Sequence, residues 1–233
     1  MPDLSTRSYE KELLDRSDIP FNDIKRNMQE LEVINAKLGG HAITLQGLKE
    51  ILQEKKEPFS ICEIGCGGGD NLKAISYWCS KRKISVKLAG IDINNDCIEY
   101  ARENCRELKS VQFITSDYLL VDFSDYKPDI IFSSLFCHHL NDEQFVDMML
   151  WCKRNSGWGF FINDLHRNPV AWYSIKLLSR LFSKSYLVKH DAPLSVQRGF
   201  KRKELTGFLQ KAGIRNYRIQ WKWAFRWLIV VNN

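Results

Sequence analysis

The chain has 233 residues, of which 44% are hydrophobic, and a formal net charge of +6. This length suits one domain with a sizeable core, with room for a small appended subdomain. No stretch approaches the ~18 apolar residues of a membrane-spanning helix, and the polar first residues do not resemble a secretory signal peptide. The seven cysteines are scattered and form no C-x-x-C pair, which is typical of a reduced protein. We therefore expect a cytoplasmic location.

Charge is distributed unevenly along the chain. Residues 151–233 hold 16 basic and 3 acidic side chains, whereas residues 1–60 and 61–150 carry net charges of −2 and −5. The basic third could attract an anionic substrate, a membrane surface or nucleic acid.

Residues 1–57 are predicted to be a helical cap. A helix is expected from Phe21 to Leu38 and ends at a glycine pair, and a second is expected over about 41–55. The apolar stripe of the first helix comprises Ile24, Met28, Leu31, Ile34 and Leu38. The cap could be a substrate lid or a flank that merely covers a sheet.

The most informative stretch, residues 61–70, reads ICEIGCGGGD. An apolar run ends on Glu63 and is followed by Gly65, Gly67 and Gly69, which indicates a strand, a tight turn and a helix. The third glycine of the dinucleotide fingerprint G-x-G-x-x-G is replaced by Asp70, and the Gly-Lys-Ser/Thr of a P-loop is missing. An acid before the glycines suits a cationic ligand better than a pyrophosphate.

The rest of the chain alternates strands with helices, which predicts a parallel, doubly wound α/β sheet. Further strands are expected at 86–92, 111–114, 128–134 and 159–164, and helices at 71–82, 94–108, 141–153 and 201–212. The carboxyl ends of parallel strands share one edge of the sheet. Glu63, Asp92 and Asp117 should therefore lie at that edge, where Asp92 could accept both hydroxyls of a ribose.

These motifs resemble those of class I S-adenosylmethionine (SAM)-dependent methyltransferases over residues 60–233. The resemblance implies a Rossmann-like, mostly parallel seven-stranded sheet with an antiparallel final strand, in a methyltransferase domain over 58–233. Strands near 214–221 and 225–232 would form its antiparallel pair. It also implies that SAM is the cofactor. The implied cofactor-binding residues are Glu63, Gly65, Gly67, Gly69, Asp92, Ile93, Asp117, Tyr118 and Ser133. Glu63 would help to hold the amino group, Asp92 the ribose, and Asp117 with Tyr118 the adenine.

The catalytic candidates follow the fourth and fifth strands. His138 and His139 could act as general bases, because an imidazole titrates near neutral pH, or they could be structural. Asp164 and His166 could also be the base. No metal is expected, because neighbouring histidines should diverge and no third ligand is evident.

Residues 165–198 look like an insertion before the next helix. Its first part, 170–182, is apolar with interspersed Lys and Arg, so it could line a substrate pocket, lie on a membrane surface or pack on the cap. Residues 190–200 are expected to be a loop. Arg167 or Arg198 could hold an anionic phenolate or carboxylate. Alternating aromatic and basic residues over 221–227 favour sheet core over nucleic-acid stacking.

A closer resemblance rests on the SSLF and HH motifs of residues 133–139, on NDLHR at 163–167, and on residues 191–200. They are similar to bacterial methyltransferases found beside type III polyketide synthases, and the histidine motif is similar to that of ubiquinone-biosynthesis-like methyltransferases. The implied function is methyl transfer to an oxygen or carbon of a hydrophobic phenolic, polyketide, quinone-like or lipid-like acceptor, with transient membrane contact. The alternatives are an RNA or protein methyltransferase, or a SAM-binding protein without catalysis.

Overall fold

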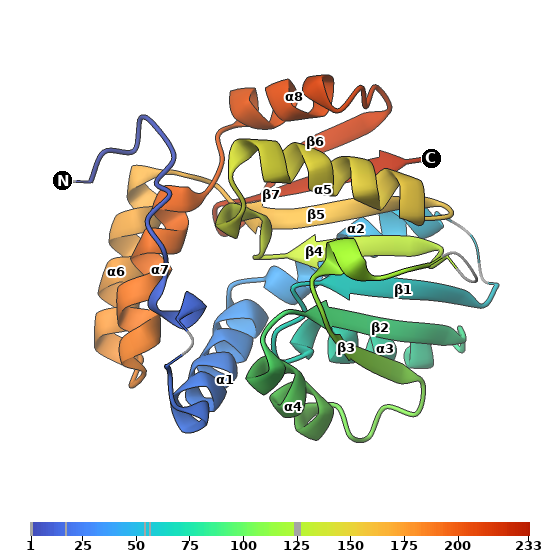
Figure 1. Cartoon of the computed structure of the whole chain (residues 1–233), viewed down its shortest axis with the longest axis horizontal. Helices are drawn as coiled ribbons and strands as arrows, with labels where there is room; N and C mark the ends of the chain where they lie inside the picture. The colour runs from blue at the N-terminus through green and yellow to red at the C-terminus, as the bar shows by residue number, and fades with distance from the viewer. Residues whose placement is uncertain (1, 17, 54, 56, 124–126) are drawn as a thin grey trace.

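The structure, a computed structural model, describes residues 2–16, 18–53, 55, 57–123 and 127–233. Its centre is a seven-stranded sheet with the strand order β3-β2-β1-β4-β5-β7-β6 (Figure 1). The strands are β1 Phe59–Ile64, β2 Val86–Asp92, β3 Val111–Thr115, β4 Ile130–Ser134, β5 Gly159–Leu165, β6 Tyr217–Lys222 and β7 Arg226–Asn232. β1 to β5 pair in parallel, and β7 runs antiparallel to both β5 and β6. The predicted fold class is confirmed.

Helices cover both faces of the sheet. Side chains of α2 and α3 pack with Phe132 and Phe161 against one face, and side chains of α5 and α8 pack with Phe160 and Ile229 against the other. The helices are α1 Phe21–Lys37, α2 Gly40–Leu52, α3 Asp70–Lys81, α4 Asn95–Asn104, α5 Asp142–Asn155, α6 Pro169–Phe182, α7 Tyr186–Arg198 and α8 Arg202–Lys211, with 3-10 turns η1 Leu13–Asp15, η2 Tyr118–Leu120 and η3 Cys137–His139. No helix of the described ranges is long and apolar enough to cross a membrane.

The carboxyl ends of the parallel strands face a wall of helices. In Figure 1 the arrowheads of β1 and β4 point towards the side where α1, α6 and α7 lie. The N-terminal segment runs along this wall and is fixed to α7, because the backbone N–H groups of Leu13 and Leu14 donate to the carboxylate of Asp191 at 2.8 and 3.0 Å. The ends of β1, β2 and β4 therefore open into the space between the sheet edge and these helices.

The expected loop over residues 190–200 is wrong. The segment is the second half of α7, which continues to Arg198 with Pro193 inside it. Proline removes a backbone donor from a helix interior and normally breaks the helix. Here Leu187, Val188, Leu194 and Val196 are buried, and Asp191 is engaged by η1, so tertiary packing outweighs the local propensity. The expected helix over 94–108 is also shorter, and ends at Asn104.

Candidate active site

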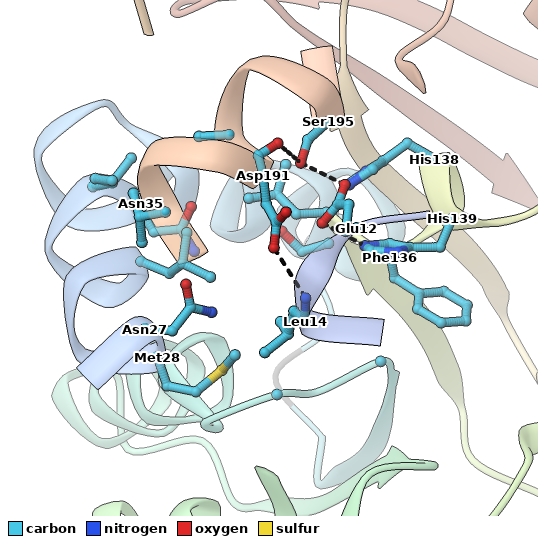
Figure 2. A pocket seen from close by; sticks show the side chains of 18 of the residues that line it. Glu12, Leu14, Asn27, Met28, Asn35, Phe136, His138, His139, Asp191 and Ser195 are labelled. Carbon is cyan, nitrogen blue, oxygen red and sulfur yellow. Dashed lines mark hydrogen bonds and ion pairs between the residues drawn. The ribbon is translucent and has the colours of Figure 1, made fainter. Parts of the chain in front are cut away.

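One cavity of about 1190 Å³ occupies the space at the carboxyl edge of the sheet. It is larger than the ~300–1,000 Å³ of a pocket for a single small ligand, so it has room for a cofactor and an acceptor together. Its lining comes from the glycine loop, the ends of β2 and β4, η1, η3, α1, α6, α7 and the turn between β6 and β7. Figure 2 shows side chains of α1, η1, α7 and η3 converging on it.

The glycine loop closes one end of the cavity. Gly65, Gly67 and Gly69 all have positive φ, at 68°, 49° and 75°, a conformation that glycine adopts without a steric penalty. A Cβ at Gly65 would lie 2.5 Å from the ring of Phe136. The backbone N–H of Gly67 donates to Oδ2 of Asp92 at 2.9 Å, which holds the loop against the end of β2.

Glu63 is buried at the end of β1 and is only half satisfied. Its Oε1 accepts a hydrogen bond from Nδ2 of Asn71 at 2.9 Å, whereas Oε2 has no hydrogen-bond partner among the described residues. Burial, together with the charges of Asp70 and Asp92, raises the pKa of Glu63 well above its usual value. A buried carboxylate in this position lacks a cation.

Arg226, at the start of β7, is a second buried charge with an unused atom on the same cavity. Nη2 donates to Oδ1 of Asn35 at 3.0 Å, but Nη1 has no hydrogen-bond partner in the described part of the chain. Burial lowers the pKa of Arg226 to about 10, although Asp164 and Asp70 oppose the shift. Asn35 also donates to Asp70 at 3.1 Å, so Asp70 lies near both unsatisfied groups.

Asp92 and Ile93 lie beside the glycine loop. The carboxylate of Asp92 accepts from the N–H groups of Gly67 and Asn94, both at 2.9 Å, and burial raises its pKa. The side chain of Ile93 is 72% exposed and borders the cavity.

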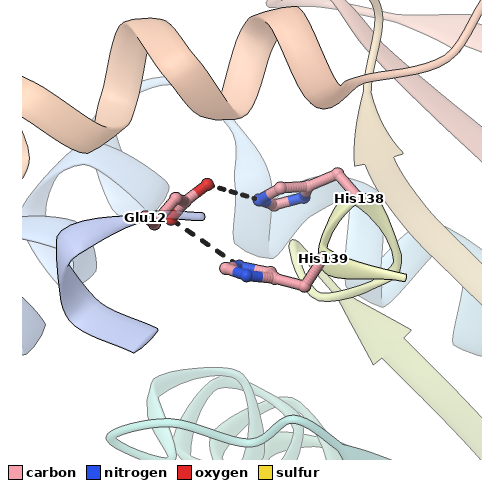
Figure 3. Close-up of side chains that lie close together, drawn as sticks. All are labelled: Glu12, His138 and His139. Atoms are coloured by element: carbon pink, nitrogen blue, oxygen red, sulfur yellow. Dashed lines mark ion pairs between the residues drawn. The ribbon is translucent and has the colours of Figure 1, made fainter. Parts of the chain in front are cut away.

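The two neighbouring histidines form the opposite wall, and they converge. Their ring centroids lie 4.5 Å apart, and the Nε2 atoms of His138 and His139 lie 3.6 and 3.7 Å from the carboxylate oxygens of Glu12 (Figure 3). The expectation that they diverge without a third partner is wrong. Both belong to the single turn η3, and Glu12 of the N-terminal segment lies next to both rings.

His138 is bound to Asp164. Its Nδ1 lies 2.8 Å from Oδ1 of Asp164, and both side chains are buried. Burial lowers the pKa of His138, but the carboxylates of Asp164 and Glu12 raise it to about 9. His139 is less buried, and its Nδ1 lies 3.3 Å from Oδ1 of Asp15.

Comparison with known proteins identifies the centre of the chain. Residues 61–155 match the family model described as "Methyltransferase domain". Residues 61–155 therefore form a methyltransferase domain, of the class I SAM-dependent type. The match includes β1, the glycine loop, β2 to β4, the two histidines and α5.

Several proteins similar to this chain are methyltransferases. The chain is 23% identical over 133 residues to the mitochondrial ubiquinone biosynthesis O-methyltransferase of Saccharomyces cerevisiae, which covers 52% of this chain and 38% of the relative. It therefore spans less than half the length of that relative. Among solved structures, a SAM-dependent methyltransferase from Aquifex aeolicus has a TM-score of 0.63 at 18% identity, covering 89% of this chain and 97% of the other. Human N-acetylserotonin methyltransferase has a TM-score of 0.64 at 18% identity, covering 92% and 56%. These structures share the fold.

Gly69 and three side chains expected at the cofactor lie outside the methyltransferase cavity. Asp117 uses its carboxylate to accept from the N–H of Leu119 at the start of η2. Tyr118 is buried in the core, with its ring against Trp151. Ser133 is fully buried and donates to the carbonyl of Ile64 at 3.1 Å. None of the three lines the cavity.

Of three further residues expected on the acceptor side, His166 and Arg167 lie outside the cavity lining and Arg198 borders the cavity. The ring of His166 packs edge-on against Trp227 away from the cavity lining, and burial lowers its pKa. Arg167 is buried in an ion pair with Glu204 and also lies outside the lining. Arg198 borders the cavity, but its guanidinium donates to the backbone carbonyls of His138 and His139 at 3.0 and 2.9 Å. It therefore holds η3 in place.

Several residues that shape the methyltransferase cavity were missed from the sequence. Glu12 and Asp15 come from the N-terminal segment, Asn35 from α1, and Arg226 from β7. They lie far from the glycine loop in sequence, and no spacing rule links them to it. Asn71 could have been found, because it opens the helix that follows the glycines and faces the end of β1.

Proposed function

We propose that the protein transfers a methyl group from SAM to an oxygen or carbon atom of a hydrophobic small molecule. The observation that carries this proposal is a pair of buried side chains that line one cavity, the acid Glu63 and the base Arg226, each with one atom that has no hydrogen-bond partner among the described residues. A zwitterionic amino acid supplies an ammonium group for the first and a carboxylate for the second. The methionine end of SAM is such a zwitterion.

The cofactor would lie along the glycine loop. Glu63 pairs with its ammonium group, and Arg226 with Asn35 binds its carboxylate, because a buried charge is stable only when it is paired. Asp92 still has free lone pairs on both carboxylate oxygens and accepts the ribose hydroxyls. The loop backbone passes beneath the methionine part, where Gly65 and Gly67 allow close approach.

The acceptor would occupy the remaining volume, which has an apolar wall. Apolar side chains from α1 and the residue after it, from α6 and α7, and from the β6–β7 turn form this wall. They are Ile24, Met28, Leu31, Ile34, Leu38, Ile175, Leu178, Val188, Val196, Trp223 and Phe225. Such a surface favours a hydrophobic molecule. His139 borders the same space and is the candidate to accept a proton from a hydroxyl. His138, fixed by Asp164, positions the turn.

A phenolic or quinone-like acceptor is the narrower proposal. The relative from Saccharomyces cerevisiae is named for O-methylation in ubiquinone biosynthesis. The apolar wall and the single histidine-lined end suit a flat, hydrophobic molecule with a hydroxyl group. Transfer to such a hydroxyl needs both orientation and loss of a proton.

RNA and protein acceptors receive less support. Three arginines of the basic C-terminal third, Arg167, Arg198 and Arg226, are buried and form internal contacts. They therefore do not add to an external basic surface of the kind that binds nucleic acid.

A cytoplasmic location and transient contact with a membrane surface also belong to the proposal. All seven cysteines are free and buried, which suits a reducing compartment. The outer face of α6 exposes Val170, Leu177, Leu181 and Phe182 at 59–78%, beside Lys176 and Arg180. Apolar side chains next to basic ones suit an anionic lipid surface, from which a lipid-like acceptor could enter the cavity.

The test is turnover with methyl-labelled SAM and a panel of phenols, resorcinols and quinols. We expect label to pass to at least one hydroxylated aromatic, and Asp92→Ala to abolish transfer. Asp147→Ala, at an exposed position of α5 outside the cavity lining, is the matched control. Label transfer to RNA or protein but to no small molecule would contradict the proposed acceptor class.

A further inference from the structure

Glu12, His138 and His139 present three ligand atoms to one point at the cavity wall. Each residue offers one atom, and the three atoms lie within 4.8 Å of one another. The two Nε2 atoms lie 3.6 and 3.7 Å from different oxygens of the same carboxylate (Figure 3). These separations are too long for hydrogen bonds. Two ligand atoms that are each about 2.1 Å from a tetrahedral ion lie about 3.4 Å apart, which is close to what is found here.

The opposite ring nitrogens are already occupied by carboxylates. Nδ1 of His138 lies 2.8 Å from Asp164, and Nδ1 of His139 lies 3.3 Å from Asp15. In the neutral imidazole, a carboxylate on Nδ1 favours the proton there, so that the Nε2 lone pair faces Glu12 once the ring has lost its second proton. Two lone pairs and a carboxylate directed at one point repel one another unless a cation or protons lie between them. Histidines that bind metal ions regularly have such carboxylate partners.

The wider surroundings also favour a cation. Glu12, Asp15 and Asp164 are the carboxylates that contact the histidines, and Ser195 orients Glu12 by donating to Oε1 at 2.6 Å. Two arginines face these carboxylates. Nη1 of Arg198 lies 3.6 Å from Asp15, while its other nitrogens donate to backbone carbonyls, and the charge of Arg226 interacts with Asp164. Glu12 and His138 are buried, at 5% and 4% exposure.

We propose that Glu12, His138 and His139 form a binding site for a divalent transition-metal ion of the zinc type. Two imidazoles and one carboxylate are a ligand set that zinc accepts, with three protein ligands leaving one position open. All three residues line the large cavity, so the open position is accessible from it. The site joins the N-terminal segment to η3, and a bound ion would tie the two together.

A role for the ion in transfer rests on the proposed function. A hydroxyl oxygen of the acceptor that binds at the open position would lose its proton more readily, and the proton would leave to solvent or to a nearby carboxylate. His139 would then act as a ligand and not as a free base. Metal binding itself needs neither SAM nor an acceptor.

The test uses untagged, metal-free full-length protein titrated with zinc chloride by calorimetry, without SAM. We expect one ion per chain. Glu12→Gln and His139→Ala should each weaken binding at least about tenfold, and Asp164→Asn should weaken it by about 10–100-fold through its effect on His138. His190→Ala is the matched control, because the side chain of this histidine is half exposed and the residue itself does not line the cavity, so the substitution should not change the affinity.

Cobalt substitution gives a second readout. Co²⁺ at a site with two histidines and a carboxylate should give visible absorption that disappears in His139→Ala and persists in His190→Ala. Unchanged zinc affinity in both Glu12→Gln and His139→Ala, no stoichiometric uptake, or a strong near-ultraviolet thiolate band would overturn the proposal. His139→Gln, at a partly exposed position, tests the site if another variant does not fold. Zinc uptake without methyl transfer would support the metal site and contradict the proposed function. Methyl transfer without zinc uptake would support the proposed function and overturn the metal site.

Discussion

Nδ2 of Asn71 donates a 2.9 Å hydrogen bond to Oε1 of Glu63, and the other oxygen of the same buried carboxylate has no hydrogen-bond partner among the described residues. Asn71 lies in the first turn of α3, directly after the glycine loop. It therefore fixes Glu63 in one orientation. The loop, the helix and the acid form one unit that leaves a single unsatisfied acceptor next to the cavity.

SAM binding should depend on pH through Glu63. The pKa of Glu63 is raised in the free protein, and an ammonium group next to it would lower that pKa, so binding releases a proton. Affinity should therefore increase as the pH rises towards the pKa of Glu63 in the free protein. Calorimetry in buffers of different ionisation enthalpy measures the proton release. Glu63→Gln should abolish it, and Glu99→Gln, on the exposed side of α4, should not.

Glu63 should also make the free energy of unfolding depend on pH. The folded-state pKa of Glu63 lies above its unfolded value of about 4.5, so the carboxyl group is harder to ionise in the folded state. Its unfavourable contribution is absent below pH 4.5 and increases as the pH rises through the folded-state pKa. In the absence of SAM, Glu63→Gln should therefore be more stable than the wild type near neutral pH. Urea unfolding at pH 4 and pH 7 would contradict this if the difference were equal at both.

Arg226 should recognise the carboxylate of the cofactor. Arg226→Ala removes a charged hydrogen bond worth ~1.5–3 kcal/mol, so the affinity for SAM should fall about 10–100-fold. Decarboxylated SAM provides the internal comparison. The wild type should prefer SAM over it, and Arg226→Ala should bind both equally. Arg218→Ala, whose side chain is more than half exposed on β6, should keep the wild-type preference. An undiminished preference in Arg226→Ala would refute this role.

Replacing glycine by alanine should change thermal stability in opposite directions at two positions. Gly65 has a φ of +68°, and a Cβ there would meet Phe136 at 2.5 Å. Gly207 lies inside α8, and its Cβ would meet nothing within 4 Å. Alanine at Gly207 should stabilise the protein by ~0.5–1 kcal/mol, which raises Tm by about 1–4 °C. Alanine at Gly65 should lower Tm and disrupt SAM binding. Thermal unfolding of both variants is the measurement, and a stabilised Gly65→Ala would contradict the geometry.

The exposed face of α6 should mediate membrane contact. The double variant Leu181→Ser and Phe182→Ser should reduce flotation with anionic liposomes several-fold, because two large exposed side chains no longer enter the lipid interface. Leu119→Ser with Leu120→Ser removes an equally exposed pair on η2 and serves as the control. Equal flotation of the two double variants would refute a specific role for α6.

The sequence predicted the sheet well because its strands have local signals. Buried parallel strands are apolar runs that end at glycines or acids, as at Glu63 and Asp92, and the strand over 86–92 has the expected bounds. The helix α7 was missed because Asp191 and Pro193 are typical of a loop, and only its packing against η1 and the core makes it helical. Local propensity cannot report such a distant contact.

The site was predictable only where its residues are close in sequence. Glu63, the glycines and Asp92 share one βαβ unit, so their proximity follows from the fold. Glu12, Asn35 and Arg226 reach the cavity from three separate elements. The convergence of His138 and His139 on Glu12 is a contact between η3 and the distant N-terminal segment, which the sequence did not reveal.

The most direct test of the account is a calorimetric titration of the wild type, Glu63→Gln and Arg226→Ala with SAM at neutral pH. We expect one SAM to bind per wild-type chain. We also expect each substitution to weaken binding at least about tenfold, because Glu63 would pair with the ammonium group of SAM and Arg226 with its carboxylate. Absence of SAM binding to the wild type, or equal affinity in all three proteins, would contradict it.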